Sequence, residues 1–411
     1  MANPLSRRLG KALEIGGIIY VLVMAEAINL PSYTLNIINI TTYGIVGLLI
    51  ILHWKKVIYT ATRDLPLVLL VGLATISIFW SGSPSYTIKD VRGLLRSTLF
   101  GAYLAARYSS REQVRLLSCV VGIAMFMSIV VALALPDYGT HFINHGIAWK
   151  GIYKHKQFFG RVLSLGISIF LITIFDKRGN KWIALAGLSI TLLLLLLSAS
   201  KTNLVVFLML VFLLPFYKIA RQHKHRAVML IIVLFVYVSV ASLISLNLET
   251  IVVDFLGKDL EFNGRTPVWT LAIEKALQQP WIGYGYSGFW SSEEAQYVLT
   301  RTWLAKENPN EIYHAHNGFL DLFLQLGLLG TILFIISFTT LLKRVVTLVT
   351  LNRNVESFWM LEILAIDLFI NLSESAIMLS SNNIYWIVYV MISFSSALEC
   401  SRISKNGIIA T

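Results

Sequence analysis

The sequence predicts an all-α integral membrane protein with about twelve transmembrane helices, and three observations lead to this fold class. Hydrophobic residues make up 56% of the 411 residues, and the mean hydropathy is +0.71. Only 14% of the residues are charged, whereas a soluble domain has about 25%. The apolar stretches are about 18–25 residues long, the length that a helix needs to cross a hydrocarbon core.

The net charge of +12 fits a membrane setting better than a nucleic-acid partner. In a chain this apolar, topology and anionic lipid explain the basic balance, so we expect no nucleic acid among its partners. The two cysteines, Cys119 and Cys400, fall inside apolar segments, where they are expected to pack rather than to pair.

The apolar segments give the order of the spans. The first one follows a basic N-terminus and is interpreted as an uncleaved span rather than a signal peptide. We expect spans near residues 13–31, 36–53, 66–80, 91–108, 114–135, 158–175, 182–199, 203–217, 227–247, 317–341, 357–377 and 383–399.

The basic residues orient these spans. With the N-terminus in the cytoplasm, the inner segments carry 21 of the 34 Lys and Arg residues, so both termini are expected to be cytoplasmic. The other 13 gather at 89–96, 150–161, 201 and 258–306 on the predicted outer face. Positive charge there opposes the insertion bias, which indicates an anionic ligand on that side.

One long outer loop, residues 248–316, separates nine spans in 1–247 from three spans in 317–411. Its length is too great for a plain connection. The stretch 266–279 is predicted to be an amphipathic helix lying on the membrane surface. Its apolar positions are Val268, Leu271, Ala272 and Leu277. A glycine-rich stretch after it predicts turns.

The strongest polar group lies where this loop meets the tenth span. His316 stands at the mouth of the helix, and Asn317, Asp321 and Gln325 follow on one face. Histidine is suited to taking a proton from a hydroxyl near neutral pH, and the helix N-terminus favours anions. His314 adds a second imidazole.

Two alternatives stay open for this group. The residues could form an ordinary interfacial His–Asn cap, without a catalytic role. The pair His314 and His316 could also hint at a metal, but no Cys or carboxylate ligand set accompanies it, so no metal or other cofactor is predicted.

Arg265 and a dense run of aromatic residues form a second candidate site. The guanidinium is a planar fork that matches phosphate oxygens. Trp269, Tyr284 and Tyr286 offer flat faces that could stack on sugar rings. An interfacial aromatic belt is the alternative.

Basic residues at the predicted outer mouth of the sixth span form a third candidate site. They are Lys154, His155, Lys156 and Arg161. Lys201 lies in a very short outer hairpin between the seventh and eighth spans. Plain membrane-surface charge and a snorkelling lysine are the alternatives. On the eleventh span, Asp367, Asn371 and Glu374 share a polar face that is expected to pack inward.

The order and spacing of these motifs resemble the O-antigen ligase and polysaccharide polymerase superfamily. The resemblance covers the whole topology and is sharpest at 263–320, where Gly264-Arg265, Trp269, Pro280, Gly283-x-Gly285 and His316-Asn317 occur in order. The stretch Trp149–Lys156 is most similar to the exopolysaccharide-polymerase branch. The resemblance implies a GT-C-like arrangement in the bacterial inner membrane.

The resemblance also implies an activity. Such proteins move an oligosaccharide from undecaprenyl diphosphate onto an acceptor glycan at the periplasmic face, with inversion and without a metal; a chain-length regulator is a further partner of this kind of system. By resemblance, His316 would be the general base and Arg265 would bind the diphosphate. Lys201 stands where the family often has arginine, and Gln157 where the branch often has asparagine, which puts these two roles in doubt.

The chemistry of the substrate agrees with this assignment. A polyprenyl diphosphate needs cations at the leaving group and a base at the nucleophile. A ligase that moves glycan onto a lipid A core is an alternative to a polymerase, and the two differ in their acceptor. A secondary transporter is a third hypothesis, but it should show two similar halves, and none is found.

Overall fold

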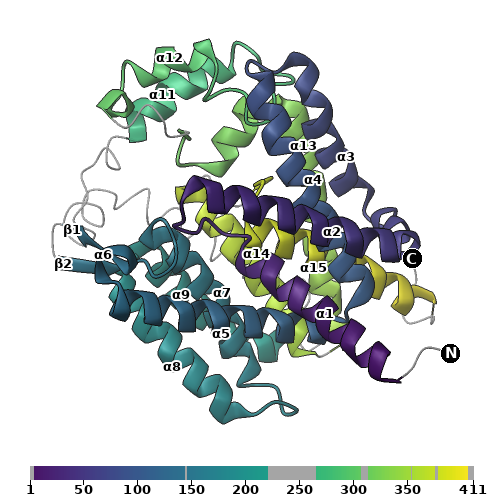
Figure 1. Cartoon of the computed structure of the whole chain (residues 1–411). Helices are drawn as coiled ribbons and strands as arrows, with labels where there is room; N and C mark the ends of the chain where they lie inside the picture. The colour runs from purple at the N-terminus through teal and green to yellow at the C-terminus, as the bar shows by residue number, and fades with distance from the viewer. Residues whose placement is uncertain are drawn as a thin grey trace.

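Long apolar helices form the body of the molecule, and a separate helical layer covers one end of it (Figure 1). The computed structural model describes residues 4–143, 146–220, 265–306, 313–352, 354–374 and 378–405. The helices of the body are α1 (Pro4–Val23), α2 (Ser32–Ala61), α3 (Leu65–Ile76), α4 (Pro84–Arg107), α5 (Ser110–Ala134), α7 (Lys156–Thr173), α8 (Lys181–Ser198), α9 (Lys201–Ala220), α13 (Gly318–Asn352), α14 (Val355–Ser373) and α15 (Ile384–Lys405).

Each of these eleven helices overlaps one predicted span. Six of them, α2, α5, α7, α8, α13 and α15, are long and apolar enough to cross a membrane by length and composition. The predicted span at 227–247 and the start of the outer loop at 248–264 lie outside the described residues. An integral membrane protein built of helices is therefore confirmed, and the count of twelve spans stays a prediction.

Capping residues explain where several helices begin. The Asp64 carboxylate accepts a hydrogen bond from the Leu67 backbone N–H at the start of α3. At α5, Ser109 and Glu112 form a capping box. The Asn180 side chain caps α8 by accepting hydrogen bonds from the backbone N–H groups of Trp182 and Ile183.

Helices α7 and α15 form the centre of the bundle. In the most apolar window of each, 78% of the residues are buried, against 28% for α8. Helix α7 packs against α5, α8, α9 and α14, while α15 packs against α4 and α13. The exposed apolar side chains of the outer helices, such as Leu193 and Leu196 on α8, suit contact with lipid.

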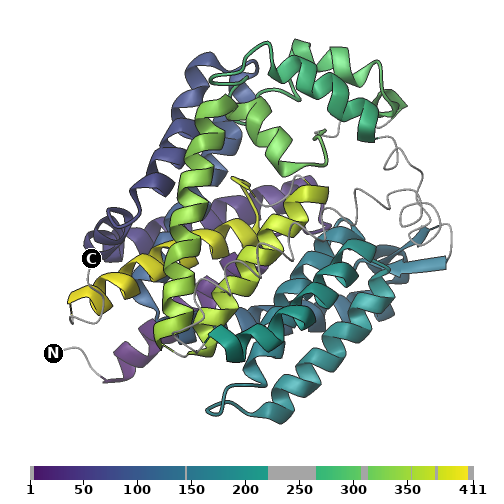
Figure 2. The same cartoon turned by 180° about the vertical axis from the view of Figure 1, so that it is seen from behind.

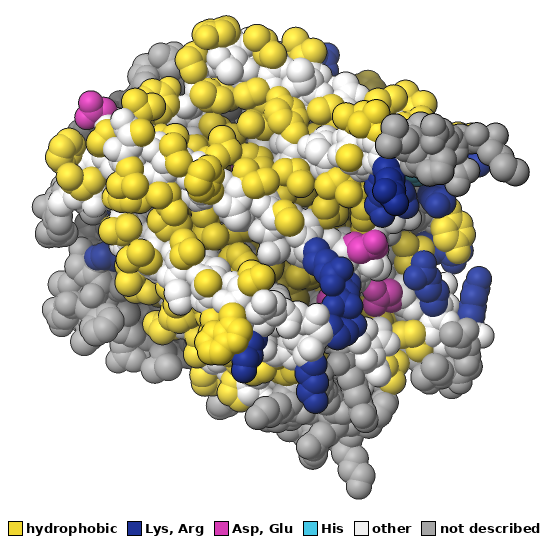
Figure 3. All heavy atoms as spheres, turned by 60° about the horizontal axis from the view of Figure 1, so that its bottom comes forward, with side chains coloured by type: hydrophobic (Ala, Val, Ile, Leu, Met, Phe, Trp, Pro, Cys, Tyr) yellow, Lys and Arg dark blue, Asp and Glu magenta, His cyan; other side chains and the backbone are white. Residues whose placement is uncertain are grey.

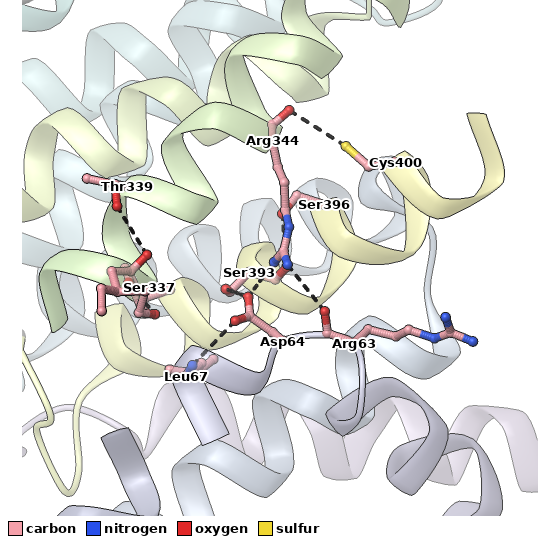
Figure 4. Close-up of polar contacts among 11 residues, drawn as sticks. Arg63, Asp64, Leu67, Ser337, Thr339, Arg344, Ser393, Ser396 and Cys400 are labelled. Atoms are coloured by element: carbon pink, nitrogen blue, oxygen red, sulfur yellow. Dashed lines mark hydrogen bonds and ion pairs between the residues drawn. The ribbon is translucent and has the colours of Figure 1, made fainter. Parts of the chain in front are cut away.

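A buried carboxylate ties three helices together at one end of the bundle (Figure 4). Asp64, which is fully buried, binds the Arg344 guanidinium of α13 at 2.5 Å and accepts a hydrogen bond from Ser393 of α15 at 2.6 Å. Arg344 also donates to the Arg63 carbonyl at 3.3 Å. Because the buried charge has both an ion pair and hydrogen bonds, the cost of its desolvation is offset.

The layer at the end of the bundle consists of α11 (Arg265–Ala276), α12 (Glu293–Leu299) and the short 3₁₀ helix η4 (Trp303–Lys306). Helix α11 confirms the predicted helix at 266–279. Part of its apolar face is covered by the protein: Val268 and Ala272 are buried in a small core with Phe289 and Leu324. Leu277 is 64% exposed, and contact of this end of the helix with the membrane surface stays a prediction.

Helix α13 runs from this layer through the bundle and is broken at Gly327 (Figure 2). Gly327 has φ +59°, and a Cβ atom there would lie 2.4 Å from the Trp281 carbonyl carbon. The N–H groups of Leu328 and Leu329, freed by the break, donate to the carbonyls of residues 280 and 281. Irregular backbone at this depth is tolerated because protein groups satisfy it.

The expected all-α fold needs one correction. The strands β1 (Thr140–Ile143) and β2 (Gly146–Trp149) pair antiparallel, with the four-residue helix α6 (Pro136–Gly139) before them. Tyr153, a few residues further on, forms a bridge with Ile28. The two short strands lack the length and strong alternation that would predict them from sequence.

The face away from the α11 and α12 layer carries a cluster of charged side chains beside extensive apolar surface (Figure 3). Ion pairs at the ends of the body helices include Arg178 with Asp176 at 3.0 Å and with Glu356 at 2.8 Å. These residues belong to segments that the sequence places on the inner side, and the inner location stays a prediction.

Candidate active site

The backbone turn that carries His316 is held from both sides. The Ala315 N–H donates to the Asp321 carboxylate at 3.0 Å, and its carbonyl accepts a hydrogen bond from the Trp269 indole at 2.6 Å. Ala315 is fully buried. His316 itself has φ +51°, a left-handed conformation that is uncommon for a residue with a side chain. Such backbone strain is typical of functional positions that the surrounding structure holds in place.

Asn317 and Asp321 anchor this turn to α13. The Asn317 side chain accepts hydrogen bonds from the backbone N–H groups of Phe319 and Leu320, both at 3.1 Å, and so caps the helix. Asp321, one turn further, also accepts a hydrogen bond from the Trp290 indole at 2.7 Å. Both polar residues therefore position the turn, and the interfacial cap considered from the sequence is present together with the strained histidine.

Glu374 lies between the two residues predicted to carry the chemistry. It follows the last residue of α14, and its carboxylate is 3.9 Å from the Nδ1 atom of His316 and 3.8 Å from the Arg265 guanidinium. The Gln157 amide donates to the same carboxylate at 2.7 Å. Residues far apart in the sequence thus meet at one carboxylate that is only 6% exposed.

Arg265 lies at the first residue of α11, with 14% of its side chain exposed. Burial lowers the pKa of Arg265, and the neighbouring Glu374 acts in the opposite direction. The guanidinium is therefore partly withdrawn from water beside a single carboxylate. An electrostatic interaction with an anion is stronger in such a place than on an open surface.

The N-terminus of α7 brings a further set of predicted residues to the same region. Arg161 is buried and pairs with Glu26 at 3.6 Å. His155 caps α7 through its Nδ1 atom, which accepts a hydrogen bond from the Gln157 N–H at 3.3 Å. Burial, with the nearby His141 and Lys156, lowers the pKa of His155 to about 4, so its imidazole is neutral at pH 7.

The three predicted lysines lie at the edge of this region. Lys154 and Lys201 are exposed, and Lys156 is half-buried. Lys156 and Lys201 are close enough for their charges to interact, although they begin two different helices, α7 and α9. A positive rim therefore borders the buried groups around Glu374, and direct contact of these lysines with a substrate stays a prediction.

The structure places Tyr284 and Tyr286 in the packed interior. Tyr284 is 6% exposed and donates to the Lys275 carbonyl at 3.0 Å. Tyr286 is 3% exposed and donates to the Leu379 carbonyl. This geometry favours a packing role for both tyrosines over the sugar-stacking role expected from the sequence.

Histidines 314 and 316 have different environments. Their ring centroids are 4.0 Å apart, and the backbone N–H of His316 donates to the Nδ1 atom of His314 at 3.2 Å. Burial, with the neighbouring His316, lowers the pKa of His314 to about 3. His314 is therefore neutral, and because its Nδ1 atom accepts a hydrogen bond, the proton is assigned to Nε2.

Sequence reasoning missed several residues of this region. Glu26, the partner of Arg161, was a lone acidic residue at the outer end of a predicted span, which is a signal for function or pairing. Gln157 differs from the asparagine common in the branch, and the sequence did not predict its bond to Glu374. Trp303, whose ring centroid lies 6.2 Å from that of His316, gave no signal of its own within the loop.

The arrangement can perform proton transfer beside an anion-binding cation. His316 is 22% exposed, so its imidazole can reach a hydroxyl group, and Arg265 lies on the other side of the same carboxylate. Among the described residues, no group of three or more His, Cys, Asp or Glu side chains is placed to hold a metal ion.

Comparison with known proteins agrees with this chemistry. Residues 183–335, which include Arg265 and His316, match a family model described as O-antigen ligase. The chain is a membrane glycosyltransferase of the polymerase or ligase type.

A curated relative narrows the resemblance further. The exopolysaccharide production protein ExoQ of Rhizobium meliloti (strain 1021) is 23% identical over 300 residues, which are 71% of this chain and 67% of the relative. The predicted resemblance to the O-antigen ligase and polysaccharide polymerase superfamily, in its exopolysaccharide-polymerase branch, is thereby confirmed.

Proposed function

We propose that the chain is a polysaccharide polymerase that transfers oligosaccharide repeat units from undecaprenyl diphosphate to an acceptor glycan on the periplasmic face of the inner membrane. The observation that carries this proposal is the position of Glu374, within 4 Å of both His316 and Arg265. A base for the acceptor hydroxyl and a cation for the leaving diphosphate thereby share one site.

In the proposed reaction, His316 takes the proton of an acceptor hydroxyl. The hydroxyl oxygen attacks the anomeric carbon, and the bond from that carbon to the diphosphate oxygen breaks, so the diphosphate leaves with the electron pair. Glu374 stabilises the imidazolium that forms, in the way that a buried carboxylate supports a catalytic histidine. A single displacement of this kind inverts the anomeric carbon.

Arg265 supplies the electrostatic part of the mechanism. The leaving diphosphate carries concentrated negative charge, and a preorganised guanidinium in a partly dry site stabilises it. In the absence of substrate, Glu374 balances Arg265, so the diphosphate competes for a guanidinium already held in place. The lysines at the edge attract the anion from solution and from the membrane surface.

A ligase that moves the glycan onto a lipid A core is the second candidate, because the family model matching residues 183–335 is described as O-antigen ligase. The chemistry at His316 and Arg265 would be the same. We favour the polymerase because the curated relative is described as an exopolysaccharide production protein. Deletion separates the two candidates: single repeats on undecaprenol accumulate without a polymerase, and full-length chains on undecaprenol accumulate without a ligase.

Transfer by the purified chain in proteoliposomes tests the proposed chemistry. Lipid-linked repeat units from a deletion strain serve as the donor, and chain elongation is measured by gel electrophoresis. We expect His316→Ala to abolish elongation without loss of expression or membrane insertion. His53→Ala on α2 is the matched control and should retain elongation. Elongation by His316→Ala would remove His316 as the base.

The proposed mechanism needs no metal ion. We expect EDTA to leave the elongation rate of the wild-type chain unchanged in the same assay. Strong inhibition by EDTA, restored by a divalent cation, would contradict a metal-independent mechanism.

A further inference from the structure

A cavity of about 180 Å³ lies directly beside the His316 turn. Its walls come from the glycine-rich stretch, the start of α13 and the residues after α14. The lining includes Ser287, Trp290, His314, Leu322, Gln325 and Leu379. The cavity therefore lies where the loop of the covering layer meets helices of the bundle.

The cavity has no positive side chain. No Lys or Arg occurs among the described residues that line it, and its acidic side chain, Asp321, already accepts hydrogen bonds from the Ala315 N–H and the Trp290 indole. It therefore differs from the immediate surroundings of Glu374, where Arg265 and Arg161 lie. A diphosphate is suited to the cationic side, and the cavity is suited to a neutral group.

Hydrogen-bonding groups and apolar surface alternate around the cavity. The Gln325 carbonyl oxygen accepts the Ser287 N–H at 3.2 Å, which leaves the amide NH₂ as a donor. His314 offers an Nε2–H donor because it is neutral and its Nδ1 atom is already bonded. Trp290, Leu322 and Leu379 contribute apolar surface. Polar donors next to an aromatic wall suit the hydroxyls and C–H faces of a sugar.

The volume limits the size of the occupant. The cavity is larger than the space of a single water molecule and smaller than the roughly 300 Å³ of typical ligand pockets. A single sugar ring is an occupant of suitable size. The ring of His314, which lines the cavity, has its centroid only 4.0 Å from that of His316.

We propose that this cavity is a binding site for one neutral sugar ring of the acceptor glycan, with Gln325, His314 and Trp290 as its contacts. The assignment rests on the proposed function. The His316 turn then borders two halves of the site: the cationic half around Glu374 binds the donor diphosphate, and the half without cations, this cavity, holds the acceptor sugar. The base is close to both, since His316 lies 3.9 Å from Glu374 and its ring centroid is 4.0 Å from that of His314.

Filling the cavity tests this assignment. Leu322 lies in the wall and is 3% exposed, so Leu322→Phe adds volume there. Leu329→Phe, on the same helix but 44% exposed, is the matched control. Ser287→Asn is a second filling variant, because asparagine tolerates the φ of +53° found at that position. Melting temperatures of the purified variants show whether each one folds.

The probe is the repeat-unit oligosaccharide released from its lipid by mild acid. Isothermal titration calorimetry measures its binding to the purified chain without donor. The elongation assay, with the released oligosaccharide as acceptor, gives its KM. Hydrolysis of the lipid-linked donor by water gives the activity of the cationic half alone.

We expect both filling variants to weaken binding of the released repeat unit and to raise its KM at least tenfold. Donor hydrolysis should stay within twofold of wild type, and Leu329→Phe should change none of these values. Unchanged binding and KM in every folded filling variant would overturn the proposal. A rise in the donor KM instead would assign the cavity to the donor sugar and would also overturn it. The wild-type chain could also turn over no donor while the filling variants still weaken binding of the released repeat unit. That result would refute the proposed function and support the assignment of the cavity as a sugar-binding site.

Discussion

At the scale of single residues, the site depends on one buried carboxylate that serves two partners. Glu374 is close to His316 and to Arg265, and Gln157 binds it as well. Removing any one partner would leave the others in an altered electrostatic environment. Effects of substitutions in this group are therefore expected to be non-additive.

Arg265→Lys tests whether the guanidinium fork matters beyond its charge. Lysine keeps the charge but cannot bind two phosphate oxygens with a planar fork. We expect kcat to fall on the order of 10²-fold, because a positioned donor to the leaving oxygens is lost. Arg301→Lys, an exposed arginine of the same loop, is the control and should behave as wild type. Wild-type rates for Arg265→Lys would mean that the arginine is structural.

The pH dependence of stability is a second prediction at this scale. The folded state holds the pKa of His155 at about 4, below its ordinary value of 6.5. Between these values the unfolded chain binds a proton that the folded chain does not, so stability decreases as the pH falls from 6.5 towards 4. We expect the melting temperature to drop over this range, and to drop less in His155→Asn, which keeps an N-cap. Equal drops in both proteins would contradict the burial of a neutral imidazole.

The sequence identified most residues of this cluster but not their arrangement. The chemistry of a base predicts His316, and the match of a guanidinium to phosphate predicts Arg265. The polar face of a spanning helix predicts that Glu374 packs inward. That they meet at one point could not be foreseen, since they come from a turn, from α11 and from the end of α14. For Tyr284 and Tyr286 the sequence predicted the wrong environment. The density of aromatic residues indicated rings exposed for stacking, whereas packing against distant segments buries both side chains.

At the scale of elements, α11 has a positioning role. It carries Arg265 at its first residue and holds the His316 turn through Trp269, one turn further on. The period of the apolar residues predicted this helix correctly. It could not show that one side of the helix would pack on α13, because a protein surface and a lipid surface are both apolar.

Trp269→Phe tests this role of α11. The substitution keeps the aromatic packing but removes the hydrogen bond to the Ala315 carbonyl, which contributes about 1 kcal/mol. We expect kcat to fall roughly tenfold, because the base is held less firmly relative to the acceptor hydroxyl. Trp281→Phe is the control, since Trp281 is 70% exposed in the same loop. An equal effect in both variants would remove the positioning role of Trp269.

At the scale of the whole molecule, the bundle has a face with clustered charged side chains at one end and the covering layer at the other, and the site lies where this layer meets the bundle. Composition and the length of the apolar stretches were enough to predict helices at the described spans. The pairing of β1 with β2 and the break in α13 were not predictable, because both depend on contacts with distant segments. The orientation in the membrane follows from charge alone and needs a direct measurement.

Reporter insertion tests the orientation. Gly179 and Thr300 are both exposed and lie outside helices. Gly179 is in a predicted inner segment, and Thr300 is in the covering layer. We expect alkaline phosphatase to be active after Thr300 and inactive after Gly179, and green fluorescent protein to be fluorescent only after Gly179. The opposite pattern would place the site on the cytoplasmic side.

The joint between the glycine-rich stretch and the broken helix restricts how this protein can change. Gly283 and Gly327 face each other's segments so closely that a Cβ atom on either would come within 2.5 Å of main-chain atoms. No side chain can be accommodated there by a small shift, so single substitutions at these two glycines cannot adjust this contact. A change in substrate preference would have to come from substitutions of the side chains around this contact. The two glycines themselves are either kept or lost together with the fold of the loop.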